Sequence, residues 1–146
     1  MHTPLLVVHV SAGLVGLVLG PVAMLAPKRP GRHTRVGVAY QAVVATLAVT
    51  AIGLAMLRLV DLWPFVFIAV ATEAAALGGW WAKRRRFKGW LPVHVNLMCG
   101  SYVSFVTAFL VVNWNSWLAW VLPTIVATPL IARASRRAAL PSVAAT

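Results

Sequence analysis

The feature that most constrains this chain is a series of long apolar blocks separated by short polar or basic connectors. Several blocks reach the roughly 20 residues that an α-helix needs to cross a bilayer. The 146-residue chain is 61% hydrophobic and only 10% charged, with a mean hydropathy of +0.86. A soluble domain of this length could not bury so much apolar surface, because its exterior is too large for its volume. The sequence therefore predicts an all-α integral membrane bundle.

Turn signals divide the chain into five predicted transmembrane helices and a basic tail. The predicted spans cover residues 4–26, 36–60, 62–82, 91–113 and 118–132, and the tail covers residues 133–146. Helix-breaking prolines and glycines follow the first span, and Asp61 with Trp63-Pro64 marks the reversal after the second. The fifth span is the shortest, about 22 Å at a rise of 1.5 Å per residue. Since it also contains Pro123 and Pro129, a position along the membrane interface is its alternative.

The distribution of Lys and Arg predicts the orientation of the bundle. Cytoplasmic loops are enriched in Lys and Arg, and here the connectors after the first and third spans are basic. Five crossings then place the N-terminus outside and the tail in the cytoplasm, whereas four would leave three arginines outside. The basic connector residues are Lys28, Arg29, Arg32 and Arg35, then Lys83, Arg84, Arg85, Arg86 and Lys88. We therefore expect a multi-pass protein of the inner (plasma) membrane.

The positions of the Lys and Arg residues also indicate which partners to expect. A net charge of +11 could indicate nucleic acid, but basic connectors between apolar spans are typical of topology determinants beside anionic lipid. We expect the lipid bilayer as partner, no nucleic acid, and either a homo-oligomer or another membrane protein beside it. Tryptophans near both predicted boundaries form the two aromatic belts of a spanning bundle. They are Trp63, Trp114, Trp117 and Trp120 near the outer boundary, and Trp80, Trp81 and Trp90 near the inner one.

Polar side chains inside predicted spans are the candidate functional residues, because such groups are costly in a bilayer and face a bundle interior or a cavity. His9 shares a helix face with Gly13, Gly16 and Gly20. Small residues at this spacing let a second helix approach closely. The pattern favours His9 as an interhelical hydrogen-bonding residue, with a ligand or proton role as the alternative.

Glu73 is the only glutamate, and it lies near the middle of the third predicted span. A carboxylate at that depth tends to be neutral or paired. A proton or ion relay, a cation site and a hydrogen-bonded structural acid all remain open for it. Arg58 is the one basic residue outside the connectors and tail, and a local pair with Asp61 is its expected arrangement.

A short element occurs twice, each time after a basic connector: a histidine followed by a tyrosine about two helical turns later. Both histidines are expected near the cytoplasmic boundary, at similar depth. Two histidines on different helices at one depth suit bis-imidazole haem ligation or a divalent metal; the alternative is two solvated or headgroup-bound histidines. The two helix faces are His33, Gly37 and Tyr40, and His94, Met98, Ser101 and Tyr102.

These elements resemble those of a family of uncharacterised, predicted bacterial multi-pass membrane proteins. His33, Gly37 and Tyr40 match its H-x-x-x-G-x-x-Y element, and the stretch from His94 to Tyr102 matches H-x-x-x-M-x-x-S/N-Y. His9, followed by glycines and Gly20-Pro21, also fits the first helix of that family. The resemblance covers about residues 5 to 113. It implies a membrane location and a three-histidine arrangement, and no established activity.

Departures from the family pattern bear on the expected ligand. Thr34 stands where the family usually carries Arg, and Val95 and Gly100 stand where it often does. Fewer arginines beside the histidines lower the expectation that an anionic group, such as a haem propionate, is held there.

Three functions follow as hypotheses. The first is a structural or accessory membrane subunit of unknown activity. The second is a small haem b or metal-binding redox protein with His33 and His94 as ligands, His9 as a third candidate, and Tyr40, Met98, Ser101 and Tyr102 lining the pocket. The third is a proton-coupled transporter that uses Glu73 with Asn96 and Tyr102. No Ser/His/Asp set or phosphate-binding glycine loop is present, so an enzyme is the less favoured class.

Overall fold

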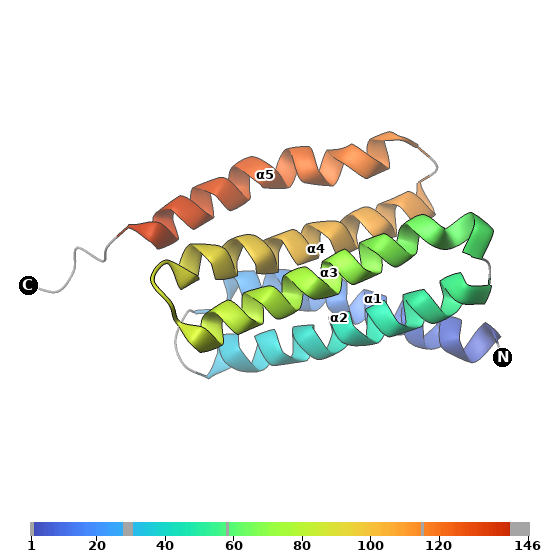
Figure 1. Ribbon diagram of the computed structural model, residues 1–146, viewed down its shortest axis with the longest axis horizontal. Coiled ribbons are helices and arrows are strands. Elements are labelled where there is room, and N and C mark those ends of the chain that lie inside the picture. Colours follow the sequence, from blue (N-terminus) through green and yellow to red (C-terminus); the bar gives the residue numbers. More distant parts are fainter. Residues whose placement is uncertain (1, 28–30, 58, 115, 141–146) are drawn as a thin grey trace, which may run out of the picture. The chain divides into compact units, whose positions relative to one another are not determined.

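The computed structural model describes residues 2–27, 31–57, 59–114 and 116–140. In these ranges the chain forms α-helices and no strand. The helices are α1 (His2–Leu25), α2 (Arg32–Leu57), α3 (Leu59–Arg85), α4 (Trp90–Asn113) and α5 (Leu118–Ala139) (Figure 1). Each is long and apolar enough to cross a membrane. The predicted all-α membrane bundle of five spans is therefore confirmed, while the direction in which it crosses stays a prediction.

Some predictions fall outside the described part of the chain. Lys28, Arg29, Arg58 and Asn115 are not among the described residues, and neither is the side chain of Asp61. The expected pair between Arg58 and Asp61 therefore stays a prediction.

The chain divides into two compact units, residues 1–73 and residues 74–146. The division falls inside α3, which is itself one continuous helix from Leu59 to Arg85. The first unit contains α1, α2 and the first part of α3. The second contains the rest of α3 together with α4 and α5.

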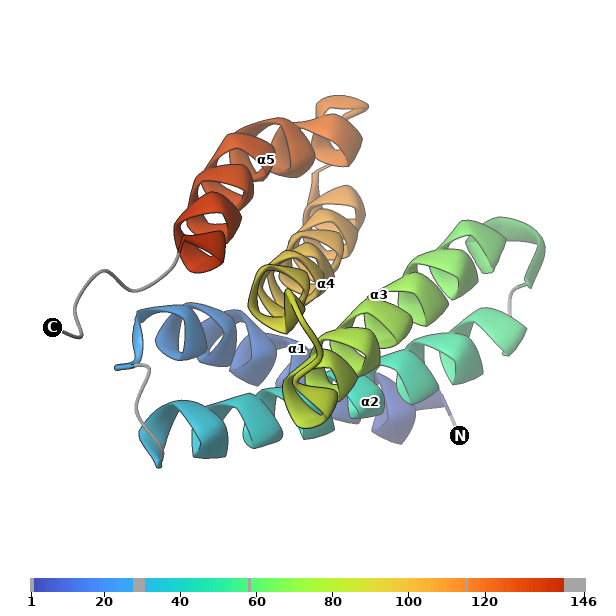
Figure 2. The same ribbon diagram turned by 60° about the vertical axis from the view of Figure 1, so that its left-hand side comes forward.

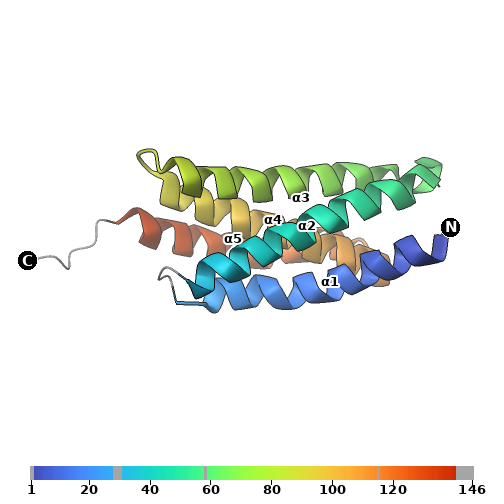
Figure 3. The same cartoon turned by 90° about the horizontal axis from the view of Figure 1, so that it is seen from below.

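In the first unit, α1 and α2 lie side by side and antiparallel (Figures 1 and 3). Small residues occupy their interface. An added Cβ at Gly13 would lie 3.9 Å from Cδ2 of Leu47, and one at Gly53 would lie 3.2 Å from Cδ2 of Leu5. The contact at Gly13 is an ordinary van der Waals distance, and the one at Gly53 is tighter. Val44 of α2 is almost completely buried.

In the second unit, α4 and α5 are neighbours (Figures 1 and 2). The helix α5 continues to Ala139, seven residues beyond the expected end of the fifth span. Ala and Arg are good helix formers, and no Gly or Pro interrupts the segment after Pro129 until Pro141. At 1.5 Å per residue the 22-residue helix is about 33 Å long, so its length suffices for a crossing despite its two prolines.

The connector between α3 and α4 is tight. Its ends are residues with positive φ: Arg86 at 46° and Gly89 at 82°. The backbone N–H of Arg86 donates to the carbonyl oxygen of Ala82 (3.0 Å), and that of Trp90 donates to Phe87 (2.9 Å). The basic connector predicted from the sequence is therefore an ordered turn with its own hydrogen bonds.

Candidate functional site

His9 links α1 to α2. Its Nδ1 lies 2.8 Å from Oγ1 of Thr50, and the hydroxyl of Thr50 is directed at backbone carbonyls of its own helix, Thr46 at 2.7 Å and Leu47 at 3.1 Å. A hydroxyl has one proton to donate. Since Thr50 donates it to the backbone, the hydroxyl oxygen accepts from His9, and we assign the His9 proton to Nδ1. His9 thus has the interhelical role that the sequence favoured.

His33 links the start of α2 to the end of α1. Its Nδ1 lies 3.0 Å from the carbonyl oxygen of Ala23, and a carbonyl can only accept, so Nδ1 is the donor. The carbonyls of the last helical turn lack partners within their own helix. For Ala23 the residue four positions on is Pro27, which has no N–H to offer. His33 therefore acts as a side-chain cap for the end of α1.

His94 makes the corresponding contact in the second unit. Its Nδ1 donates to the carbonyl oxygen of Gly79 at 2.8 Å, joining α4 to α3. One turn later on α4, Met98 covers the same glycine. A Cβ added at Gly79 would lie 2.8 Å from Cγ and Sδ of Met98 and 3.3 Å from its backbone nitrogen. The H-x-x-x-M spacing therefore brings two side chains of α4 against Gly79 of α3: His94 as a hydrogen-bond donor and Met98 as a packing group.

The three histidines share a tautomer. Each donates its Nδ1–H to an oxygen of a neighbouring helix, so a neutral ring carries its lone pair at Nε2. Histidines that ligate a metal commonly donate the other ring N–H to a backbone carbonyl in this way, which fixes the orientation of the ring. The arrangement therefore links the helices through Nδ1 and leaves Nε2 of each neutral ring without a proton.

Glu73 is hydrogen-bonded to Gln41, a residue that the sequence analysis did not indicate as part of a site. The amide Nε2 of Gln41, on α2, donates to Oε1 of Glu73 at 2.9 Å. The other oxygens of this pair, Oε1 of Gln41 and Oε2 of Glu73, are buried and have no hydrogen-bond partner among the described residues, and neither does the buried Oγ1 of Thr72, the residue before Glu73. The available signal was Gln41 itself, a lone amide directly after Tyr40 in an apolar helix. The result is a polar cluster, rich in acceptors, within the first unit.

The remaining predicted site residues lie at different degrees of burial. Tyr40 is buried on α2, and Ser101 is completely buried on α4. The hydroxyl of Ser101 donates to the carbonyl oxygen of Met98 at 2.8 Å. Tyr102 is half-buried, with its ring edge-on to Phe105 at a centroid distance of 6.3 Å. Asn96 is exposed.

Not all of the candidate residues belong to one unit. His9, His33, Tyr40 and Glu73 lie in the first unit, and the residues from His94 to Tyr102 lie in the second. The joint site of His33 and His94 would combine residues of both units, so it stays a prediction. Within the described ranges, no group of three or more His, Cys, Asp or Glu side chains is placed to hold a metal ion.

Comparison with known proteins identifies a family. Residues 6–144 match the family model described as "Predicted membrane protein (DUF2306)". No curated protein matches, and no solved structure does. The match extends over nearly the whole chain and confirms the resemblance drawn from the histidine motifs.

Proposed function

This chain belongs to the DUF2306 family of predicted membrane proteins, and we propose that it is an accessory membrane protein whose polar side chains serve to join its helices. One observation carries this proposal: each of the three histidines expected as a ligand donates to an acceptor on a neighbouring helix. Hydrogen bonds between membrane helices contribute about 0.6 to 2 kcal/mol each. Three such bonds together contribute about 2 to 6 kcal/mol to the association of the helices.

The partner of such a protein would be a second copy or another membrane protein. Large apolar side chains are exposed along every helix, and they can face lipid or a protein neighbour. Crosslinking in native membranes tests this part of the proposal. Recovery of a homo-oligomer or of one defined partner supports it, and recovery of the monomer alone contradicts it.

A second candidate function is ligation of haem b or a divalent metal by His33 and His94. The observation that favours it is the shared tautomer, since Nδ1–H donation to Ala23 and to Gly79 leaves the lone pair at Nε2 of each ring. Haem iron in proteins is held by such imidazole nitrogens. His9 has the same tautomer and is the third candidate ligand.

Asparagine substitution separates the two functions. The amide Nδ2 of Asn occupies about the position of the histidine Nδ1 and can donate the same hydrogen bond, but Asn cannot replace Nε2 as an iron ligand. If the histidines only join helices, His33→Asn and His94→Asn should keep most of the stability, whereas His33→Leu and His94→Leu should each lose about 0.5–1.5 kcal/mol. Thermal unfolding of the full chain in mild detergent measures this difference.

Absorption spectra provide the complementary measurement. Reduced-minus-oxidised spectra of protein expressed with adequate haem should show no haem band if the accessory function is right. A haem band that is lost in both Asn variants would instead establish the second function. A bound divalent metal that both Asn variants lose would do the same for a metal site.

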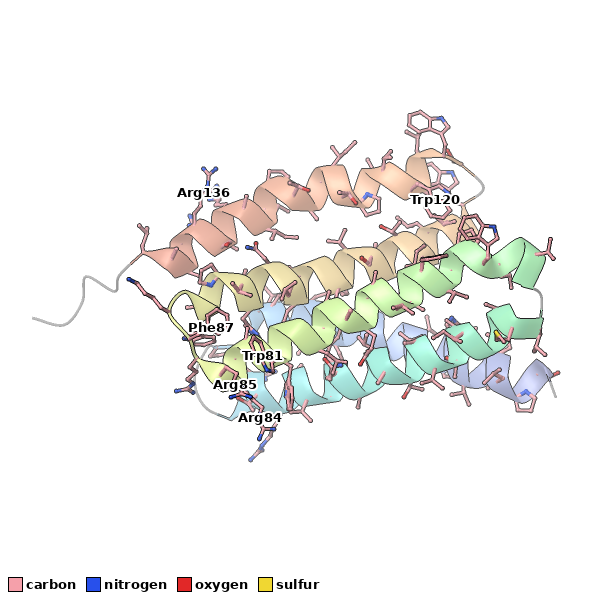
Figure 4. All side chains as sticks on the ribbon, viewed as in Figure 1. Trp81, Arg84, Arg85, Phe87, Trp120 and Arg136 are labelled. Carbon is pink, nitrogen blue, oxygen red and sulfur yellow. The ribbon has the colours of Figure 1, made fainter. Side chains whose placement is uncertain are left out.

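We also propose that the N-terminus lies outside and that the protein belongs to the inner membrane. In the second unit, Arg84, Arg85 and Arg136 lie at one end and Trp120 lies at the other (Figure 4). One basic end on a helical hairpin is what the positive-inside rule requires of the cytoplasmic side. Reporter fusions at Gly89 and after Thr146 should both be cytoplasmic, and an external reporter at either point contradicts the orientation.

A further inference from the structure

We infer that the connector between α3 and α4 forms a binding site for the phosphate of an anionic phospholipid headgroup. The site is a cluster of three consecutive arginines and three indoles, referred to below as the arginine–tryptophan cluster. It consists of Arg84, Arg85 and Arg86 with Trp80, Trp81 and Trp90. All six residues belong to the second unit.

Each arginine of the cluster rests on a different indole. The guanidinium carbon of Arg84 lies 4.8 Å from the ring centroid of Trp80, that of Arg85 lies 5.9 Å from Trp81, and that of Arg86 lies 5.9 Å from Trp90. These distances fall within the range of cation–π contacts. Trp81 also packs on the ring of Phe87, at 5.8 Å between centroids. Figure 4 shows Trp81, Arg84, Arg85 and Phe87 gathered at the end of α3.

A stacked guanidinium can still bind an anion at its edge. The indole covers a face of the planar group, whereas the N–H donors point outward in the plane, where they can form two parallel bonds to a phosphate. All three arginine side chains are exposed. Stacking also restricts the long side chains, so less conformational entropy is lost when an anion binds.

No side chain in this half of the protein can neutralise the cluster. The whole sequence has two acidic residues, Asp61 and Glu73, and both precede Ala74. The second unit therefore contains no side-chain carboxylate. Lys83, Lys88 and the arginines of α5 add further positive charge. The second unit therefore offers the cluster no side-chain anion of its own.

The backbone at Arg86 supports a role for its side chain. Its φ of 46° is in the left-handed region, directly after the end of α3. Glycine is the usual residue at this position of a helix end, because any side chain there costs conformational energy. An arginine here is unfavourable for the turn, and its guanidinium carbon lies 5.9 Å from the ring centroid of Trp90.

The surroundings favour a lipid over other phosphate compounds. The cluster stands where two apolar helices, α3 and α4, meet their connector, and both helices are long enough to cross a membrane. Trp80 and Trp81 are exposed, and exposed indoles at a helix end sit at the level of lipid headgroups. A basic segment at that level binds anionic lipids.

Tryptophan quenching by brominated lipids tests the inference on the full chain in neutral detergent. Brominated phosphatidylglycerol should quench fluorescence at lower concentration than brominated phosphatidylcholine. The triple variant Arg84→Gln/Arg85→Gln/Arg86→Gln should weaken the apparent affinity for phosphatidylglycerol by about tenfold or more. The matched control, Arg133→Gln/Arg136→Gln/Arg137→Gln, removes the same charge from α5 in the same unit and should have a much smaller effect.

Several outcomes would overturn the inference. Equal losses in the two triple variants would mean that net charge, and not the cluster, attracts the lipid. Displacement of phosphatidylglycerol by inorganic phosphate would indicate a site for free phosphate, and displacement by a short DNA duplex would indicate nucleic acid.

A single substitution should change the stability of the protein and its lipid affinity in opposite directions. Arg86→Gly relieves the left-handed backbone, so the melting temperature should rise, while the affinity for phosphatidylglycerol should fall severalfold. Lys88→Gly removes one charge from the same connector and serves as the control for lipid affinity. A variant Arg86→Gly with unchanged lipid affinity contradicts the role of Arg86.

Discussion

Replacing Gly79 by alanine should force α4 away from α3 and destabilise the second unit. The new Cβ would lie 2.8 Å from Cγ and Sδ of Met98 and 3.3 Å from its backbone nitrogen, and the shift that relieves the clash would lengthen the hydrogen bond from His94 to the Gly79 carbonyl. Overpacking of this kind costs about 1–3 kcal/mol. Valine should cost more than alanine. The free energy of unfolding in detergent, with increasing sodium dodecyl sulfate as denaturant, measures the loss.

Two further variants show whether the clash is the cause. Gly100 lies on α4, and apart from its chain neighbours and its own helical backbone the structure places no described atom within 4 Å of a Cβ there. Gly100→Ala should therefore stabilise the helix by up to about 1 kcal/mol. Met98→Ala removes the side chain that meets the new Cβ and should restore much of the stability of Gly79→Ala. Equal destabilisation by alanine at the two glycines would refute the packing argument.

Replacing Glu73 by leucine should destabilise the first unit, and replacing it by glutamine should not. Leucine leaves the amide of Gln41 without the acceptor that it now has at 2.9 Å. A buried donor without a partner costs about 1–3 kcal/mol. An amide in place of the carboxyl still accepts from Gln41 and can also donate to Oε1 of Gln41, which now lacks a partner. Thermal unfolding of both variants measures the difference.

The same variants bear on the proton-coupled transport that Glu73 could support. An amide cannot carry a proton across the bilayer, so Glu73→Gln should abolish proton flux in liposomes if this acid is the carrier. Unchanged flux, or none in the unsubstituted protein, would leave Glu73 with a structural role. Thr72→Val is the matched control, because it removes a neighbouring buried hydroxyl that has no partner and should be neutral or stabilising.

The helices could be predicted from the sequence because the signal for a membrane span is local. Twenty apolar residues in a row specify a crossing whatever surrounds them, and all five blocks form helices. The first and last residues of the helices differ more from the predicted spans. The helix α2 begins at Arg32, inside the basic connector, and α5 continues through Arg133 to Ala139. Hydropathy marks where a helix leaves the apolar layer, whereas helix propensity and capping decide where it stops.

The sequence indicates candidate residues through their polarity and spacing, but it does not indicate the residues that they contact. Spacing identified His94 and Met98 as one face, yet nothing local indicates that this face meets Gly79. The sequence did not indicate Gln41 as a site residue for the same reason. Its hydrogen-bond partner, Glu73, lies 32 residues later, and the sequence does not show that the two side chains meet. Contacts between helices depend on packing, which a pattern along one helix does not contain.

The charge of the connector between α3 and α4 also makes its transfer across a bilayer depend on the membrane potential. It carries five positive charges between Lys83 and Lys88, and moving one charge across the bilayer changes its energy by about 2.3 kcal/mol per 100 mV. Carrying all five charges against such a potential costs about 11.5 kcal/mol. With no acidic residue after Glu73 to offset this charge, an energised membrane would hold the second half of the protein in one orientation.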